Sequence, residues 1–270
     1  MLATIRCRYF QKAFAFSAPI GALAGLIGLG GGEFRLPVLM HVIGFGARAA
    51  VPINLAVSLV TLAFALAARG HAVPLAGLGA HGPEILGLLA GGMLTAVWGA
   101  RLVHRLSDAR LVHLISTLLA GLGVLLLAEA VFPFGQGGWL DGNAMLRGIA
   151  GLLIGLGVGV VSSLLGVAGG ELLIPALVLV FGADIKTAGS ASILISLAIV
   201  AIGLARHYTL GGLNFRGGAR RMIGAMSLGS LFGAAIGGLA VAYAPSEALK
   251  VLLGVVLLVA AGKTLRKAAS

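Results

Sequence analysis

Long apolar stretches alternate with short charged ones along the whole chain. Six stretches contain no Asp, Glu, Lys or Arg: 14–32, 49–68, 111–128, 148–170, 187–205 and 222–246. A helix needs about 20 apolar residues to cross the hydrocarbon core of a bilayer, and several of these stretches are that long. The alternating ten-residue pattern of a membrane β-barrel is absent. The pattern therefore predicts an all-α polytopic membrane protein.

The chain also repeats itself after 138 positions, without a gap. The most specific coincidences are Gly28/Gly166, Gly31/Gly169, Gly32/Gly170, Glu33/Glu171 and Pro37/Pro175. Such self-similarity indicates two homologous structural units. We divide the chain into an N-terminal tail (1–13), a first transmembrane repeat (14–132), a linker (133–147) and a second repeat (148–270).

Each repeat is predicted to contain five apolar segments. They are 14–29, 36–45, 49–68, 84–103 and 111–132, and then 148–167, 174–181, 187–205, 221–243 and 247–265. The second segment of each set is too short to cross a bilayer, because a helix rises about 1.5 Å per residue. Glycine clusters interrupt a helix, and proline suits the first turn of a new one. We expect two broken helices, with new half-helices starting near Leu36 and Ile174.

The basic residues predict the orientation in the membrane, because cytoplasmic loops are enriched in Lys and Arg. Both termini and the connection 101–110 are basic, whereas the linker 133–147 contains no Lys or Arg before Arg147. The termini are thus expected in the cytoplasm and the linker outside. Residues 239–248, the counterpart of 101–110, are expected outside, which predicts inverted repeats. Counting each broken hairpin as one element instead gives four segments per unit and parallel repeats.

Glycines spaced by four recur along the predicted helices, as in Gly87/Gly91 and Gly151/Gly155. Such spacings let two helix backbones approach closely. We expect these glycines to serve packing.

Composition excludes several classes of function. Only 10% of the residues are charged, and the net charge of +11 comes from basic residues at the ends of apolar runs, so no nucleic-acid partner is expected. The single cysteine, Cys7, forms no intrachain disulfide, and the six histidines lack metal-ligand spacing. The glycine stretches match no nucleotide-binding loop. We therefore expect no enzyme, no cofactor and no metal site.

Glu33 and Glu171 are the most unusual residues, because a carboxylate at membrane depth costs roughly 3 kcal/mol on insertion scales. Both follow the glycines of a predicted helix break. One hypothesis is that they carry protons during transport or bind a cation. The alternative is that they cap the N–H groups of the half-helices. The two roles are compatible.

The same breaks are candidate anion sites, since helix N-termini present free N–H groups and positive dipole ends. The candidate substrate-binding glycines are Gly30, Gly31, Gly32, Gly169 and Gly170. Arg35 has no basic counterpart, as position 173 is Leu, and is either a ligand contact or a residue that reaches to the membrane surface. Arg48 and Lys186 supply nearby charge or mark the membrane interface.

Polar side chains follow each break on the third segment. Asn54 and Ser58 lie on one helix face, as do Ser192 and Ser196. They are candidate hydrogen-bond partners of an oxyanion, with helix–helix bonding as the alternative. His41, in the first short segment, titrates near neutral pH or has a structural role.

The stretches Gly28-Leu-Gly-Gly-Gly-Glu-Phe-Arg-Leu-Pro37 and Gly166-Val-Ala-Gly-Gly-Glu-Leu-Leu-Ile-Pro175 resemble the motifs of the TauE/SafE family of sulfite and sulfonate transporters. The resemblance covers nearly the whole chain. Position by position it marks Gly30, Gly31, Gly32 and Pro37, with Gly169, Gly170 and Pro175. Family members often have an apolar residue where Glu33 and Glu171 stand, and Arg35 is a second departure.

The sequence thus predicts a secondary transporter of a small sulfur-containing anion in a bacterial inner membrane, with Glu33 and Glu171 coupling transport to protons. The expected partners are the anion and the lipid bilayer, and a second copy of the chain is a candidate partner in a homodimer. One alternative is a channel or divalent-cation transporter with the two glutamates as ligands. Another is a membrane scaffold that transports nothing.

Overall fold

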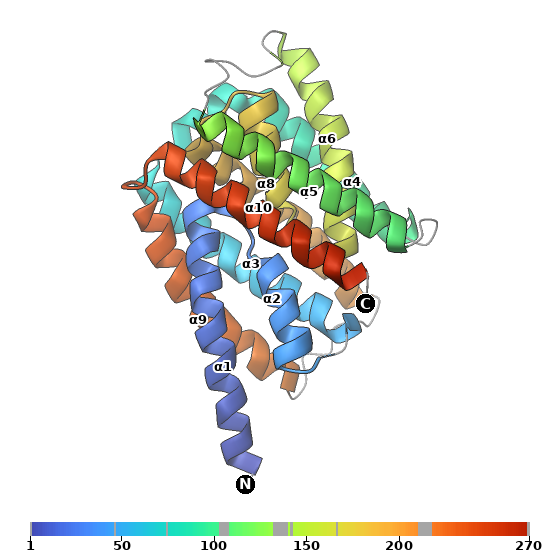
Figure 1. The fold of residues 1–270 in the computed structure, drawn as a ribbon, viewed down its shortest axis with the longest axis vertical. Coiled ribbons are helices and arrows are strands. Elements are labelled where there is room, and N and C mark those ends of the chain that lie inside the picture. Colours follow the sequence, from blue (N-terminus) through green and yellow to red (C-terminus); the bar gives the residue numbers. More distant parts are fainter. Residues whose placement is uncertain are drawn as a thin grey trace.

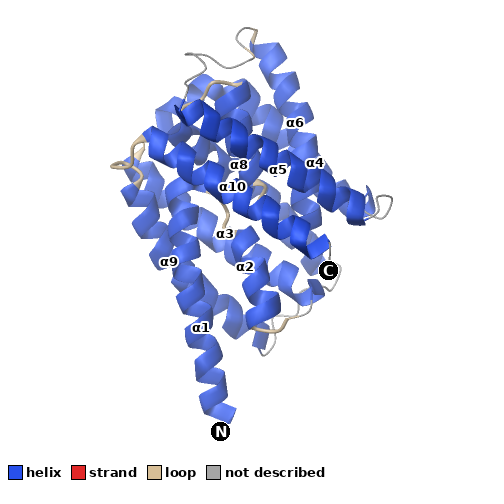
Figure 2. Ribbon diagram, in the orientation of Figure 1, coloured by secondary structure: helices blue, strands red, loops and turns tan. Residues whose placement is uncertain are grey.

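The computed structural model describes residues 2–45, 47–73, 75–102, 108–131, 140, 143–165, 167–209 and 218–268. Most of the predicted linker 133–147 and Gly166 therefore lie outside the described residues. Within them the elements of regular secondary structure are helices, joined by short loops and turns, as Figure 2 shows. Ten α-helices are formed there, so the predicted all-α class is confirmed.

The helices follow one another with short connections and π-helical or 3-10 turns. In the first half they are α1 (Leu2–Leu23), η1 (Ala24–Gly28), α2 (Gly32–Pro37), η2 (Val38–Val42), α3 (Ala47–Ala72), η3 (Leu75–His81), α4 (Gly82–Leu102) and α5 (Asp108–Val131). In the second half they are α6 (Ala144–Leu165), α7 (Gly170–Pro175), η5 (Ala176–Val180), α8 (Ile185–Thr209), α9 (Gly218–Ala240) and α10 (Ser246–Ala268). Each predicted segment overlaps one or two of these elements, although α1 begins well before residue 14.

Four helices in the described part of the chain are long and apolar enough to cross a membrane. They include the stretches Ala49–Ala72, Ala144–Ser162, Ile185–Thr209 and Ala219–Ala240. The spans in α3, α8 and α9 are more than half buried inside the protein, whereas only 22% of the span in α6 is buried. α6 therefore presents apolar side chains such as Met145 and Leu153 outward, as expected toward lipid.

The half-helices begin earlier than predicted. α2 starts at Gly32 and α7 at Gly170, so Pro37 and Pro175 end an α-helical turn rather than opening one. Both prolines lead into a π-helical turn. Proline has no N–H to donate and its ring clashes with the carbonyl four residues earlier, which explains why regular α-helical bonding stops there.

Closely packed glycines join helices from different parts of the chain. A Cβ atom at Gly155 in α6 would lie 2.9 Å from the Cα atom of Leu88 in α4, and one at Gly233 in α9 would lie 2.6 Å from the backbone nitrogen of Ala22 in α1. Backbone contact this close requires glycine. The prediction that these glycines serve packing is confirmed.

The contacts also give the relative directions of the helices. In the α4–α6 pair, Gly151 meets Glu84 and Gly155 meets Leu88, so both helices run the same way. The same holds for α1 and α9, where Phe14 meets Gly229 and Ala22 meets Gly237. Figure 1 shows α1 starting at the N-terminus at the bottom and α6 starting at the top. The two broken helices therefore enter the molecule from opposite ends.

Candidate functional site

The two helix breaks have the same local structure. Gly31 and Gly169 precede α2 and α7 directly and have φ angles of 67° and 77°. A side chain in this left-handed region would be strained, which explains glycine at both positions. Neither break receives a side-chain capping hydrogen bond at this residue.

The two breaks also touch each other. A Cβ atom at Gly32 would lie 3.3 Å from Cγ1 of Val167, and one at Gly170 would lie 3.3 Å from the Cα atom of Leu29. Gly30 faces Ala168 in the same way. Because α1 and α6 come from opposite ends, the N-termini of α2 and α7 meet in the interior. The sequence-predicted glycines are thus brought together at one place.

Glu33 and Glu171 meet at this place. Each is the second residue of its half-helix, directly after Gly32 or Gly170, so the contact between the breaks brings the two acidic residues into the same region. In each residue the Oε1 atom is buried and has no hydrogen-bond partner in the described part of the chain.

Arg35 lies beneath the first break and is fully buried. Its Nη1 donates to Ser58 Oγ at 3.0 Å and approaches Asn54 Oδ1 at 3.5 Å. Its Nη2 donates to Thr61 Oγ1 at 3.2 Å and to Ser230 Oγ at 3.1 Å. The alternative that Arg35 reaches to the membrane surface is wrong, because hydroxyl and amide groups of α3 and α9 hold the side chain inside.

All the side chains that hold Arg35 are uncharged, and its Nε atom is buried without a partner among the described residues. A buried charge is costly unless it is paired and hydrogen-bonded. The guanidinium thus has neutral hydrogen-bond acceptors and one unused donor in the described part of the chain, and the charge of Glu33 also acts on it.

The polar residues of α3 and α8 contact the breaks in corresponding ways. Asn54 Nδ2 donates to the carbonyl of Gly32 at 3.1 Å, and Ser196 Oγ donates to the carbonyl of Ala168 at 2.9 Å. Ser192 is fully buried beside Gly170, and its Oγ has no hydrogen-bond partner in the described part of the chain. The structure therefore brings all four predicted polar residues to the site.

Arg69 is a buried arginine that the sequence did not single out. Its Nη1 donates to the carbonyls of Gly25 and Leu26, both at 2.9 Å, and its Nη2 donates to the carbonyl of Lys186 at 2.7 Å. Nε donates to Ser190 Oγ at 3.1 Å. The carbonyls of Gly25 and Leu26 lie in η1, at the C-terminal end of the first broken helix, where backbone acceptors lack helical partners. Arg69 thus ties η1 to the start of α8.

Other candidates lie elsewhere or outside the described residues. The side chains of Pro37, His41 and Arg48 lie outside them. Lys186 Nζ donates to the carbonyl of Ala242 at 3.3 Å, at the start of α8 rather than at the breaks. Among the described residues no group of three His, Cys, Asp or Glu side chains is placed to hold a metal ion.

The family model described as "Sulfite exporter TauE/SafE" matches residues 13–264. Nothing among curated proteins or solved structures matches the chain significantly.

Proposed function

The chain belongs to the sulfite exporter TauE/SafE family, a family of membrane transporters and not of enzymes, and on that premise we propose that it is a secondary transporter of a small sulfur-containing anion such as sulfite or an organosulfonate. The anion binds where the two helix breaks meet. Proposed contacts are Gly30, Gly31, Gly32, Arg35, Asn54, Ser58, Gly169, Gly170, Ser192 and Ser196.

The observation that carries this proposal is the environment of Arg35. All the described hydrogen bonds of this fully buried guanidinium go to neutral side chains, so its donors are not used by a carboxylate, although the charge of Glu33 also acts on it. Guanidinium–oxyanion hydrogen bonds are charge-assisted and strong. An anion at the break would also use Nε of Arg35 and the hydroxyl of Ser192, which lack partners among the described residues.

The glycines and helix termini support the same substrate class. The N-termini of α2 and α7 meet at the break, and each helix continues through a π-helical turn to Val42 or Val180. Their free N–H groups and positive dipole ends favour negative charge. Because glycines line both breaks, a ligand can approach the backbone there.

We also propose that the two units, 14–132 and 148–270, are inverted repeats. The opposite directions of α1 and α6 support this, as do the matching φ angles of Gly31 and Gly169. The N- and C-termini would then lie in the cytoplasm and the linker 133–147 outside, in a bacterial inner membrane. Two units meeting at one central site are the arrangement that alternating access uses.

Glu33 and Glu171 are proposed to couple transport to protons. Two neighbouring carboxyl groups repel each other when both are ionised, so in this proposal the pair gains and loses one proton as a unit. Since each glutamate belongs to a different break, gain or loss of this proton changes the attraction between the two units.

The same pair supports a second candidate function. Two adjacent carboxyl groups with unpartnered oxygens are also suited to bind a cation, which would make the protein a channel or divalent-cation transporter. A cation flux that needs no anion distinguishes this candidate from the first.

Transport by the purified protein in proteoliposomes tests the proposal. Labelled sulfite should enter saturably, and an imposed pH gradient should increase its uptake. Absence of saturable flux for any sulfur oxyanion would reject the anion transporter.

A single variant tests the coupling role. In Glu171→Gln, sulfite exchange should persist while its response to the pH gradient disappears, because one carboxyl group of the pair no longer titrates. Glu247→Gln, at an exposed acid in the first turn of α10, is the matched control and should respond like the parent. An unchanged response in Glu171→Gln would rule out proton coupling through this residue.

A further inference from the structure

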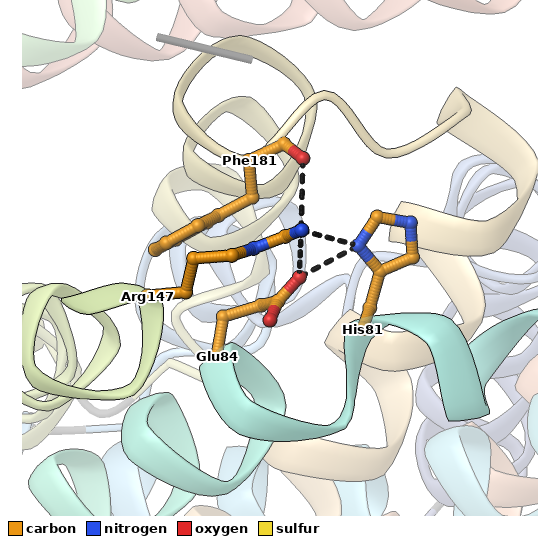
Figure 3. A network of polar contacts seen from close by, with 4 residues as sticks. All are labelled: His81, Glu84, Arg147 and Phe181. Carbon is orange, nitrogen blue, oxygen red and sulfur yellow. Dashed lines mark hydrogen bonds and ion pairs between the residues drawn. The ribbon is translucent and has the colours of Figure 1, made fainter. Parts of the chain in front are cut away.

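A buried ion pair joins the start of α4, the start of α6 and the end of η5 (Figure 3). Nη2 of Arg147 donates to Oε1 of Glu84 and, at 3.2 Å, to the carbonyl of Phe181. Nδ1 of His81 lies 2.7 Å from the same carboxylate oxygen and 3.1 Å from Nη2. In the neutral imidazole this nitrogen either donates to Glu84 or accepts from Arg147.

The position of Phe181 gives this cluster its significance. It follows directly after η5, the last turn of the short segment that begins at Gly170. That segment starts at the candidate site and returns to the end of the molecule from which α6 entered. Arg147 therefore binds the outer end of the segment whose inner end carries Glu171.

The strength of the contact depends on burial. The Glu84 side chain is fully buried and that of Arg147 is 19% exposed, so little water competes for either charge. Only one nitrogen of Arg147 serves all three contacts, while its Nε and the second oxygen of Glu84 have no partner among the described residues. The pair thus lacks the two-fold bidentate geometry of a permanent Arg–carboxylate link.

The cluster occurs at one end of the molecule. With the shift of 138 positions, Glu84 corresponds to Met222 and Arg147 corresponds to Tyr9. The other end of the repeat therefore lacks the charges needed for an equivalent ion pair. A contact that one repeat has and the other lacks distinguishes the two sides of the membrane.

We propose that Glu84 and Arg147 form a latch that holds the outer end of the 170–181 segment closed, and that the latch opens when the site is exposed to the outside. The proposal rests on the proposed transport function and on the orientation with the start of α6 outside. His81 shares the carboxylate and limits the ways in which it can rotate away.

Accessibility of a single cysteine measures this opening directly. Ala183 is buried two residues beyond Phe181, and Cys7 is the only native cysteine. In a Cys7→Ser background, Ala183→Cys should react slowly with a membrane-impermeant maleimide added outside right-side-out vesicles. When Glu84→Gln is combined with Ala183→Cys in this background, the rate of maleimide labelling at position 183 should rise about tenfold or more. Such a rise is expected when a charged contact that favours the closed state is lost.

Glu129→Gln is the matched control. Glu129 in α5 pairs with Lys250 in α10 at 2.8 Å, with side chains 14% and 18% exposed, and no described hydrogen bond or ion pair links either residue to the 170–181 segment. The Glu129→Gln substitution should leave the labelling rate of Ala183→Cys unchanged. An equal rise in both variants would indicate general loosening and overturn the latch.

A second variant covers the case in which Glu84→Gln fails to accumulate as a monodisperse protein. Arg147→Lys keeps the charge but loses the planar donors that reach Glu84 and Phe181 together, so it should raise the rate by a smaller factor. An unchanged rate in a folded latch variant, or a rise seen only in inverted vesicles, would overturn the proposal.

The labelling needs no substrate, so its outcome is independent of sulfite transport. If Glu84→Gln speeds the labelling but the protein transports no sulfur oxyanion, the proposed function is rejected and the proposed latch is still supported. Normal sulfite flux with unchanged labelling would reject the latch alone.

Discussion

At the scale of single residues, glycines and buried arginines determine the geometry of the site. The glycines were predictable, because a cluster of them inside an apolar run is a strong signal of a helix break. The roles of Arg35 and Arg69 were not, because each depends on groups far along the chain, such as Ser230 and Lys186. A basic residue near the end of an apolar run is otherwise typical of the membrane interface.

The glycines with left-handed backbone should be sensitive to a single methyl group. Gly31→Ala should lower the free energy of unfolding by about 2–4 kcal/mol, through backbone strain and overpacking, because its Cβ would lie 2.7 Å from Cγ2 of Ile20. Gly44 has a φ of 86° but nothing within 4 Å of an added Cβ. Gly44→Ala should therefore cost only the strain, about 1–2 kcal/mol. Thermal unfolding in detergent measures both, and equal costs would contradict the packing at the break.

At the scale of helices, the number and order of the elements followed from the apolar pattern, and the starts of the half-helices did not. The sequence placed those starts next to Pro37 and Pro175, whereas the structure begins α2 and α7 at Gly32 and Gly170. Each half-helix is a short α-helical turn followed by a π-helical turn. Such a short mixed segment has no regular spacing of apolar residues in the sequence from which its start could be predicted. Its start is instead set by the glycine that precedes it.

The α4–α6 pair should depend on the glycines between the two helices. Gly155→Ala should destabilise the protein by about 1–3 kcal/mol, because the new methyl group would force the two backbones apart. Gly157 is on the same helix, with nothing within 4 Å of an added Cβ. Gly157→Ala should be neutral or stabilise by up to about 1 kcal/mol, as alanine favours helix. Destabilisation by Gly157→Ala but not by Gly155→Ala would contradict the described packing.

At the scale of the whole molecule, the repeat of 138 positions predicted two related breaks, and the structure places them in contact. Their meeting depends on α1 and α6 entering from opposite ends, which the distribution of basic residues had suggested. The ion pair of Glu84 and Arg147 breaks this relation, since its residues have no charged counterparts in the other repeat. Contacts present in only one repeat could not be inferred from the repeat pattern.

The proposed orientation predicts which ends of α8 and α9 face outside. Tyr243, just after α9, and Tyr208, near the end of α8, are both exposed, at 90% and 63%. In a Cys7→Ser background, Tyr243→Cys should react with an impermeant maleimide outside the cell, and Tyr208→Cys only in inverted vesicles. Labelling of both from one side would contradict the orientation.

The central claim is that Arg35, where the two breaks meet, binds the transported anion. Calorimetric titration of sulfite onto the purified protein tests it most directly. The parent should bind saturably, and Arg35→Leu, which introduces the residue found at position 173, should bind about 10- to 100-fold more weakly, as expected for the loss of hydrogen bonds to a charged group. Arg35→Lys should lie between the two. Equal sulfite affinity in the parent and in folded Arg35→Leu would contradict the account.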